Sequence, residues 1–537
     1  MKSSVQLQQF KKCMLLCMAG ILCSGLACAL YIINPVKLIL DYHLRMAPGT
    51  LAFGIWRKPP IEVFLKVYIF NITNPKEFLN GDEQLKLEEI GPYVYQELLE
   101  HQNIIWNDNG TMTYFPKRDI VYVPEMSVGD PRKVTVTVPN VPILGVTSAL
   151  HDKGFLLNFP LTQFLNAMGA KPILNMSAYE YLWGYHDPII KLAGSIVPGF
   201  INFQKFGLLD RMYDEGHNVV TMNIKHSKNM TDEKERYLSI HTYNGSPGLS
   251  QWGYIKPNGN VTPAEDVTCN TVQGATEGTL FPSHLNKQAV FRVFRKSFCR
   301  ALPIIFQEEL VSKEGISVYK YGFADNFLDP PDINPDNQCL CKKSNKCLKK
   351  GLSDLTPCYY NIPVAISLPH FLDADPSLTK RIQGLNADPQ KHKTAIYVQP
   401  DIGIPMKVQS RLQINLVMQE SPYNPKMAEF NGMTVPVIWS ELLIAQLPSD
   451  LMWIIQLSTN IGPKITTAFI CILVISGAGL VSLSMAGTLW VLNQQQEEES
   501  GRRDSCDLRI PLGYGQYTGI RILPAIKKIT SRTDIFV

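Results

Sequence analysis

Two long uncharged apolar blocks stand near the two ends of the chain. The first spans residues 13–33, and the second spans residues 465–492. About 20 apolar residues suffice for a helix to cross the hydrocarbon core of a bilayer. Both blocks are longer than that and therefore predict transmembrane helices.

The first block has a second interpretation, as a cleaved signal peptide. Ala27, Cys28 and Ala29 fit the small-x-small cleavage pattern. However, the apolar run continues past them to Ile33, as the run of an anchor does. We therefore expect an uncleaved anchor.

Charges beside the first block predict the topology. Lys2, Lys11 and Lys12 precede it without any acidic residue, and flanks rich in lysine stay in the cytoplasm. The expected segments are a cytoplasmic N-tail (1–12), a helix (13–33), an extracellular or lumenal ectodomain (34–464), a second helix (465–492) and a cytoplasmic C-tail (493–537).

Glycosylation sequons support this topology, because asparagine is glycosylated only on the lumenal side. Every N-x-S/T sequon with a middle residue other than proline lies within 34–464. The candidate sites are Asn71, Asn109, Asn175, Asn229, Asn244 and Asn260.

Between the two blocks, apolar residues alternate with period two in several segments, which is typical of strands. Three valines of 134–138 share one face, as do Val63, Leu65, Val67 and Ile69. The longest face, in 406–418, consists of Met406, Val408, Leu412, Ile414, Leu416 and Met418.

Helical patterning appears in four windows, and strand patterns flank them. Because no repeat or low-complexity linker divides the ectodomain, we expect one large α+β domain that is mainly β. The windows are 161–169, 176–193, 283–296 and 439–457.

The net charge of +4 resides in the two tails, so the ectodomain is neutral. A neutral ectodomain has no global field that would steer nucleic acids or other polyanions. The sequence therefore argues against a nucleic-acid partner.

Six of the twelve cysteines lie in the ectodomain: Cys269, Cys299, Cys339, Cys341, Cys347 and Cys358. An even set in an oxidising compartment predicts three disulfides, and the spacing leaves their pairing open. A zinc site would need CxxC pairs or histidine partners, and this stretch has neither. The lysines of 342–350 predict a solvated loop or, alternatively, a local anion-binding patch.

Motifs for catalysis are missing from the sequence. It contains no GxSxG, HExxH or GxxxxGK[ST] pattern. Asp373 and Asp375 could form an acid pair, but carboxylates at this position commonly cap the following helix. We expect caps, no enzyme, and no metal or cofactor.

Seven segments together resemble the class B scavenger receptor family, which includes the fatty-acid translocase, the lysosomal integral membrane proteins and the sensory neuron membrane proteins. The two-anchor topology and the order of the six cysteines match as well. The segments are 67–78, 89–95, 181–190, 278–285, 366–376, 382–388 and 411–416.

The resemblance implies a β-barrel-like ectodomain with a helical apex, here about 150–235, and a hydrophobic tunnel that leads toward the membrane. It also implies the disulfides Cys269–Cys339, Cys299–Cys358 and Cys341–Cys347. Lys171 lies near the position of a lipid-contacting lysine of the fatty-acid translocase. Unlike the basic apex of family members that take up polyanionic particles, 150–235 has eight basic and nine acidic residues.

We expect a cell-surface receptor that binds a hydrophobic lipid (fatty acid, sterol ester, carotenoid or phospholipid) or a lipid carrier particle and passes lipid through the tunnel to the membrane. The alternative is a lysosomal or endosomal trafficking receptor for a protein cargo. Residues 517–520, with Tyr517 and Ile520, fit the Y-x-x-Φ endocytic signal, which favours the plasma membrane with endocytosis.

Two further features concern the spans. Cys13 and Cys17, at the cytoplasmic edge of the first span, are candidate palmitoylation sites, with Cys506 of the C-tail as a weaker one.

Small residues spaced by four let helices approach closely and predict association of helices within or between chains, including a possible homo-oligomer. The two stripes are Gly20, Ser24 and Cys28, and Ala478, Ser482 and Ala486.

Overall fold

The structure is a computed structural model of the chain. It divides the protein into two compact units, the terminal segments Met1–Ile33 with Ala468–Val537, and the ectodomain Asn34–Thr467. The described residues are 2–196, 201–214, 216–225, 234, 236–255, 268–341 and 347–503.

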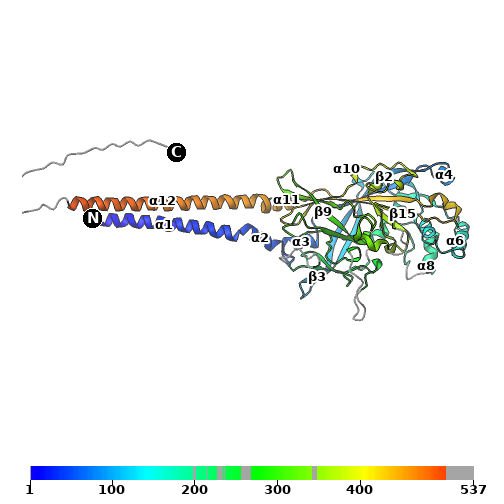
Figure 1. The fold of residues 1–537 in the computed structure, drawn as a ribbon, viewed down its shortest axis with the longest axis horizontal. Helices are drawn as coiled ribbons and strands as arrows, with labels where there is room; N and C mark the ends of the chain where they lie inside the picture. Colours follow the sequence, from blue (N-terminus) through cyan, green and yellow to red (C-terminus); the bar gives the residue numbers. More distant parts are fainter. Residues whose placement is uncertain are drawn as a thin grey trace, which may run out of the picture. The chain divides into compact units, whose positions relative to one another are not determined.

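Two long helices carry the apolar blocks: α1 (Lys2–Ile33) and α12 (Gly462–Arg503) (Figure 1). Helix α2 (Pro35–His43) follows α1 after a single residue, and α11 (Ser449–Gln456) continues into α12 through a π-helical turn. The helical segment formed by α1 and α2 and the one formed by α11 and α12 are each long and apolar enough to cross a membrane. The helices thus extend beyond the two apolar blocks at both ends.

Small residues bring α1 and α12 into contact. A side chain added at Gly477 would come within 2.5 Å of Ser24 Oγ, and one added at Gly20 within 2.7 Å of Val481. Ser484 Oγ donates a hydrogen bond to the Cys13 carbonyl at 2.6 Å. Gly20 and Ser24 of the first predicted stripe therefore face α12, as close packing in a membrane requires, whereas Cys28, its third member, is exposed.

The second predicted stripe does not take part in this contact. Ala478, Ser482 and Ala486 are exposed, whereas Gly477 and Ser484 are buried against α1. Spacing alone could not separate these neighbouring faces, because both consist of small residues.

The ectodomain is built on one antiparallel sheet in the order β7-β6-β3-β2-β1-β16-β15-β14-β10-β9-β8. Three short strands attach to it, and β4 and β5 form a separate pair. The strands of the main path are β1 (Val63–Ile72), β2 (Leu85–Trp106), β3 (Thr111–Tyr122), β6 (Val220–Asn223), β7 (Ile240–Tyr243), β8 (Phe291–Arg295), β9 (Arg300–Val311), β10 (Ser317–Phe323), β14 (Ala395–Val398), β15 (Pro405–Val417) and β16 (Thr434–Ile444). The others are β4 (Thr135–Pro139), β5 (Ile173–Ser177), β11 (Ser353–Asp354), β12 (Val364–Ser367) and β13 (Ile382–Gln383).

The segment 274–276 joins the two edge strands of the sheet. Ile240 of β7 exchanges backbone hydrogen bonds with this segment at 2.7 and 2.9 Å. On the other side, Thr276 bonds with Arg292 and Phe294 of β8 at 2.7 and 2.9 Å. The sheet therefore closes on itself as a barrel, which confirms the β-barrel-like fold.

The first and last strands of the ectodomain are neighbours in the barrel. Val63 at the start of β1 pairs with Ile444 at the end of β16. Both ends of the ectodomain consequently leave the barrel at the same end, where α2, α3 (Leu51–Arg57) and α11 lie (Figure 1).

Helices gather at the opposite end of the barrel and form the helical apex (Figure 1). They are α5 (Val141–Ala149), α6 (Phe155–Ala167), α7 (Ala178–Trp183) and α8 (Pro188–Ile196), and α9 (Leu208–Tyr213) packs against α7. The remaining α-helices are α4 (Pro75–Leu79) and α10 (Pro389–His392).

One of the four helical windows was wrong, and another was right only in its second half. The window 283–296 contains no α-helix, and strand β8 occupies most of its second half; the window 439–457 begins with the end of β16 and contains all of α11. In β8, Phe291, Val293 and Arg295 alternate along one face, but Phe291 and Phe294 also have helical spacing. Pairing with β9 selected the strand over the helix.

A stacked pair of histidines lies beside the barrel wall. The rings of His370 and His392 are 4.5 Å apart between centroids. His370 Nδ1 accepts the Asn386 N–H at 3.1 Å, and His392 Nδ1 accepts the Asp388 N–H at 2.9 Å. His370 Nε2 donates to Glu89 at 2.8 Å. These contacts require both imidazoles to be neutral, because each Nδ1 must offer its lone pair.

Burial and the adjacent His370 lower the pKa of His392 to about 4, against opposing contributions from Glu89 and Asp388. Arg411 lowers it further. The unfolded chain therefore binds a proton at His392 at a higher pH than the folded chain does. Its contribution to stability is complete above the ordinary histidine pKa of about 6.5 and is lost as the pH falls toward 4.

We predict that His392→Asn reduces the acid sensitivity of the fold. Asparagine can accept the Asp388 N–H but does not titrate, so the melting temperature of the variant should fall less than that of the wild type between pH 7 and pH 4.5. Thermal unfolding at both pH values measures this difference. The exposed His217 provides the control, and His217→Asn should follow the wild type. Parallel pH dependence of all three proteins would contradict the assignment.

The contact of α1 with α12 predicts the outcome of an oxidative crosslinking experiment. A side chain at Gly487 would lie 2.8 Å from Cys13 Sγ, so Gly487→Cys should form a disulfide with Cys13 within one chain. Adding Gly477→Leu should lower the yield, because leucine cannot fit against Ser24. Adding Ser482→Leu should leave it unchanged. Mass spectrometry of non-reduced peptides measures the yield of the disulfide. A yield lowered by Ser482→Leu and unchanged by Gly477→Leu would show that the face with Ser482 forms the contact.

Candidate functional site

A cavity of about 200 Å³ lies inside the barrel. Alternate residues of a strand point to the same face, and here the inward faces of neighbouring strands supply a wall that is mainly apolar. The faces predicted from 63–69 and 406–418 contribute to it. Wall residues include Val63, Leu65, Leu302, Ile304, Val408, Leu412, Leu442 and Ile444.

A second, smaller cavity of about 40 Å³ lies on the side of the helical apex. Val141 of α5, Phe206 and Ile362 line it, and its walls are almost entirely apolar. Met212 of α9 lines both this apical cavity and the central cavity. The two cavities thus share a lining side chain.

At the other end of the barrel, an open groove of about 540 Å³ runs beside α3. Its lining includes Leu51, Ile55 and Lys58, and Lys58 also lines the central cavity. The apical cavity, the central cavity and this basal groove therefore form a row in which neighbours share a lining residue.

One polar cluster interrupts the apolar wall of the central cavity. Glu97 of β2 accepts hydrogen bonds from Arg295 of β8 at 3.1 Å and from the Tyr213 hydroxyl at 3.1 Å, and it lies 3.3 Å from Arg118 Nε of β3. Burial acts to raise the pKa of Glu97, but Arg295 and Arg118 outweigh it and hold the pKa below its ordinary value. Glu97 is therefore a buried anion that ties three elements together.

A second buried pair adjoins this cluster. His101 stacks on Trp56 with ring centroids 4.1 Å apart, and its Nδ1 lies 2.7 Å from the Trp56 carbonyl. A carbonyl only accepts, so Nδ1 carries a proton. His101 Nε2 lies 3.2 Å from Glu277 of the cavity wall, with the two side chains 0% and 9% exposed. Burial acts to raise the pKa of Glu277, but His101, Arg118 and the Tyr114 hydroxyl outweigh it and hold the pKa below its ordinary value.

Disulfides brace the region where the barrel closes. The structure contains Cys269–Cys339, Cys299–Cys358 and Cys341–Cys347, the pairing that the resemblance implies.

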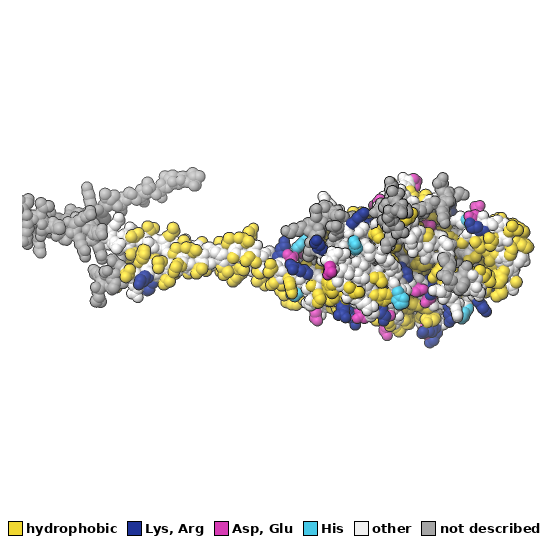
Figure 2. Space-filling view, turned by 90° about the horizontal axis from the view of Figure 1, so that it is seen from below, with side chains coloured by type: hydrophobic (Ala, Val, Ile, Leu, Met, Phe, Trp, Pro, Cys, Tyr) yellow, Lys and Arg dark blue, Asp and Glu magenta, His cyan; other side chains and the backbone are white. Residues whose placement is uncertain are grey.

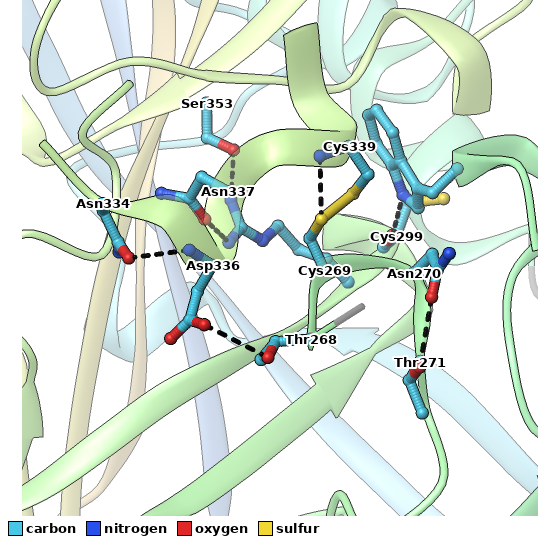
Figure 3. Close-up of a disulfide and its surroundings, with 12 residues drawn as sticks. Thr268, Cys269, Asn270, Thr271, Cys299, Asn334, Asp336, Asn337, Cys339 and Ser353 are labelled. Carbon is cyan, nitrogen blue, oxygen red and sulfur yellow. Dashed lines mark hydrogen bonds between the residues drawn. A yellow bond between two sulfur atoms is a disulfide. The ribbon is translucent and has the colours of Figure 1, made fainter. Parts of the chain in front are cut away.

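Figure 3 shows Cys269–Cys339 with its polar surroundings. The buried Arg300 donates to Ser353 and, at 2.7 Å, to Asn337. Asn337 in turn donates to the Asp329 carbonyl at 2.7 Å. These bonds fix the loop that carries Cys339, and its disulfide partner Cys269 lies only a few residues before the segment that joins the sheet edges.

The carboxylates considered as an acid pair have separate structural roles. Asp375 accepts the Ser377 N–H at 2.7 Å at the start of a 3₁₀ turn, which confirms the expected cap. Asp373 instead pairs with Lys393 at 3.2 Å. Among the described residues, no group of three or more histidine, cysteine, aspartate or glutamate side chains is arranged to hold a metal ion.

Lys171 is exposed and does not line the three spaces of the row. Its contact with lipid stays a prediction. Cys13 and Cys17 are half-buried on α1 and form no disulfide. Their acylation also stays a prediction. Cys506, Tyr517, Ile520 and residues 342–346 lie outside the described residues.

The sequons differ in their surroundings. Asn109, Asn175 and Asn244 are exposed, whereas Asn71 is half-buried within β1 and accepts the Thr137 N–H at 2.7 Å. Glycosylation of all six sites stays a prediction, and Asn229 and Asn260 lie outside the described residues.

Sequence reasoning missed the polar cluster. Arg295 and Glu97 are separated by 198 residues, and no periodic pattern joins them. A weak signal existed, because Arg295 stands in phase with the inward-facing Phe291 and Val293. A charged residue at an inward position of a strand is unusual enough to mark a site.

Comparison with known proteins agrees with this architecture. Residues 14–488 match the model of the CD36 family. The chain is 29% identical to scavenger receptor class B member 1 of Rattus norvegicus over 79% of each chain. It is 30% identical to lysosome membrane protein 2 of Homo sapiens over 74% of this chain and 78% of that protein. The two terminal apolar helices fit a membrane protein with both termini in the cytoplasm. The chain belongs to the CD36 family.

Proposed function

We propose that this protein is a receptor that accepts a hydrophobic lipid at the helical apex and passes it through the barrel toward the membrane. The observation that carries the proposal is the row of spaces from the apical cavity through the central cavity to the basal groove, joined by Met212 and Lys58. Apolar side chains line most of the two enclosed cavities. The basal groove lies at the end where the ectodomain continues into the spans.

The physics of lipid transfer supports this function. Exposure of a lipid to water costs about 0.8 kcal/mol for each CH₂ group, so a long acyl chain leaves its carrier very slowly. A conduit with an apolar wall removes much of this barrier. Such transfer breaks no covalent bond, which is in keeping with a receptor that is not an enzyme.

The helical apex offers a surface on which a carrier could dock. Phe155, Leu156 and Phe159 of α6 are 58%, 88% and 46% exposed, and Figure 2 shows hydrophobic side chains gathered at the end that carries α6. Exposed apolar groups of this size mark interaction surfaces. Because the predicted apex has nearly equal numbers of acidic and basic residues, apolar contact rather than charge would hold a carrier there.

The same surface favours one alternative, a receptor that escorts a protein cargo to lysosomes. An exposed apolar helix suits a groove on a partner protein as well as a lipid particle, and one relative is named lysosome membrane protein 2. This alternative uses α6 but needs no enclosed cavity. A bulky side chain that blocks the central cavity would therefore distinguish the two functions, because it should stop lipid transfer without affecting a cargo receptor.

We predict that Ser410→Trp slows lipid transfer but leaves carrier binding intact. Ser410 lines the central cavity, and an indole there should slow transfer about tenfold or more, because overpacking an enclosed site costs on the order of 1–3 kcal/mol. Cells expressing the variant would be assayed for carrier binding and for uptake of its labelled lipid.

Lys407→Trp is the matched control. Lys407 lies on the same strand but is exposed, so this variant should transfer lipid at the wild-type rate. Normal transfer by a correctly folded Ser410→Trp variant would refute the conduit and favour the cargo receptor.

Apolar burial also predicts the thermodynamic signature of lipid binding. The heat-capacity change on binding should be negative, and affinity should change little with salt, because the ectodomain is neutral and enclosed charges are poorly screened. Calorimetric titration of the full-length protein in nanodiscs would measure both. Affinity that collapses with rising salt would indicate a surface anion site, with the lysines of 342–350 as the first residues to substitute.

A further inference from the structure

Helix α11, at the base of the ectodomain, carries large apolar side chains on its exposed face as well as on its buried one. Leu451 and Ile455 are buried in the hydrophobic core. Trp453, which is 57% exposed, lies on the outside together with Ile454 and the adjoining Leu457. A surface helix of a globular protein normally presents polar residues to water. The exterior of α11 therefore suits a less polar environment than water.

Helix α2 repeats this arrangement beside α11. Leu40 packs against the same core cluster, whereas Leu38 and Tyr42 are exposed, Tyr42 by 59%. A side chain added at Gly462, just beyond the π-helical turn that follows α11, would meet Val36 of α2 at 3.4 Å. The exposed apolar residues of the two helices thus gather in one region, and such clusters mark interaction surfaces.

The turn between β9 and β10 adds a third element, which is far from both spans in the sequence. Gln456 Nε2 donates a hydrogen bond to the Glu314 carbonyl at 3.5 Å. Asn460 Nδ2 donates one to the Gly315 carbonyl at 3.4 Å. At the end of β9, Val311 is 71% exposed. We define the basal face as α2, α11 with Leu457, and the hairpin tip 311–316.

The helices of the basal face are separated from the spans by breaks in the helical path. Asn34, with a left-handed φ of 44°, lies between α1 and α2, and the π-helical turn Leu457–Ile461 lies between α11 and α12. Turns of this π-helical kind are common sites of helix kinks. Because the apolar blocks 13–33 and 465–492 each suffice to cross the hydrocarbon core, the basal face lies where the chain leaves the membrane.

The charges near the basal face match the head-group layer of a bilayer. Residues 34–58 and 449–464 carry five basic and only two acidic residues, although the ectodomain as a whole is neutral. Basic side chains form charge-assisted hydrogen bonds with phosphate groups, and tryptophan and tyrosine are enriched at the membrane–water interface. All five basic residues are exposed: Lys37, Arg45, Arg57, Lys58 and Lys464.

We propose that the basal face is immersed in the phospholipid head-group layer of the non-cytoplasmic leaflet. The barrel then rests on the membrane through its own surface, besides being tethered by the two spans. This contact is independent of the proposed function. In a conduit, it would hold the basal groove, with Leu51 and Lys58 in its lining, against the leaflet that receives the lipid.

Tryptophan fluorescence of the full-length protein in phosphatidylcholine nanodiscs tests the proposal. The contribution of Trp453 is the difference between the wild type and Trp453→Phe. Two kinds of nanodisc carry bromine, which quenches tryptophan, on the acyl chains either near the head group or near the chain end. Trp453 should lose most of its emission to bromine near the head group, less to bromine near the chain end, and little to iodide in the buffer.

A tryptophan on the hairpin separates contact by the barrel from simple continuation of a span. Val311→Trp, made in the Trp453→Phe background, should show the same order of quenching, because this strand enters no span. Leu156→Trp in the same background is the matched control. Leu156 is 88% exposed on α6 at the opposite end of the barrel, so its tryptophan should be quenched by iodide and by neither brominated lipid. Thermal unfolding shows that each variant is folded.

Four results would overturn the proposal. Quenching of Trp453 by iodide alone would place the basal face in water. Protection from iodide and from both brominated lipids would show that protein covers it, for instance a second copy of the chain. Strongest quenching by bromine near the chain end would make α11 part of the span. Quenching of Trp453 without quenching of the Val311→Trp residue would leave the barrel clear of the lipid. None of these measurements involves lipid transfer, so each result leaves the conduit standing.

Discussion

A curved sheet can enclose space only if its two edges are joined, and the interior of this ectodomain depends on that closure. Segment 274–276 joins β7 to β8 through backbone hydrogen bonds on both sides. The disulfide Cys269–Cys339 fixes the chain just before this segment, and Arg295 ties β8 to Glu97 of β2 across the interior. Without the closure, the apolar wall of the cavity would face water.

The alternation of apolar residues was sufficient to predict the strands and their inward faces, but it could not show what those faces enclose. Val63, Leu65, Val67 and Ile69 share one face of β1, as the period predicted. The first two line the cavity, whereas the last two are fully buried in close-packed core. Period two reports only that a face is shielded from water. Whether side chains or an empty volume lie opposite depends on strands that are far away in the sequence.

The polar features of the cavity could not be predicted from the sequence for the same reason. Glu97, Arg295 and Tyr213 come from three separate segments, and each is an unremarkable residue within its own segment. The disulfide pairing came from the family resemblance, not from spacing, which left it open. Strand β8 was mistaken for helix, because a five-residue strand gives too few residues to separate the two periods. Local patterns thus predicted elements well and missed contacts between distant elements.

The pairing of β1 with β16 has a consequence for how the protein is made. A ribosome delivers the chain from its N-terminus, and β1 enters the lumen long before its partner, which is the last strand of the ectodomain. The edge of β1 that will receive β16 stays unpaired through most of translation, and unpaired apolar edges of nascent chains attract chaperones and wrong partners. Completion of the barrel therefore coincides with the arrival of the second span at the translocon, so that folding and membrane insertion finish together.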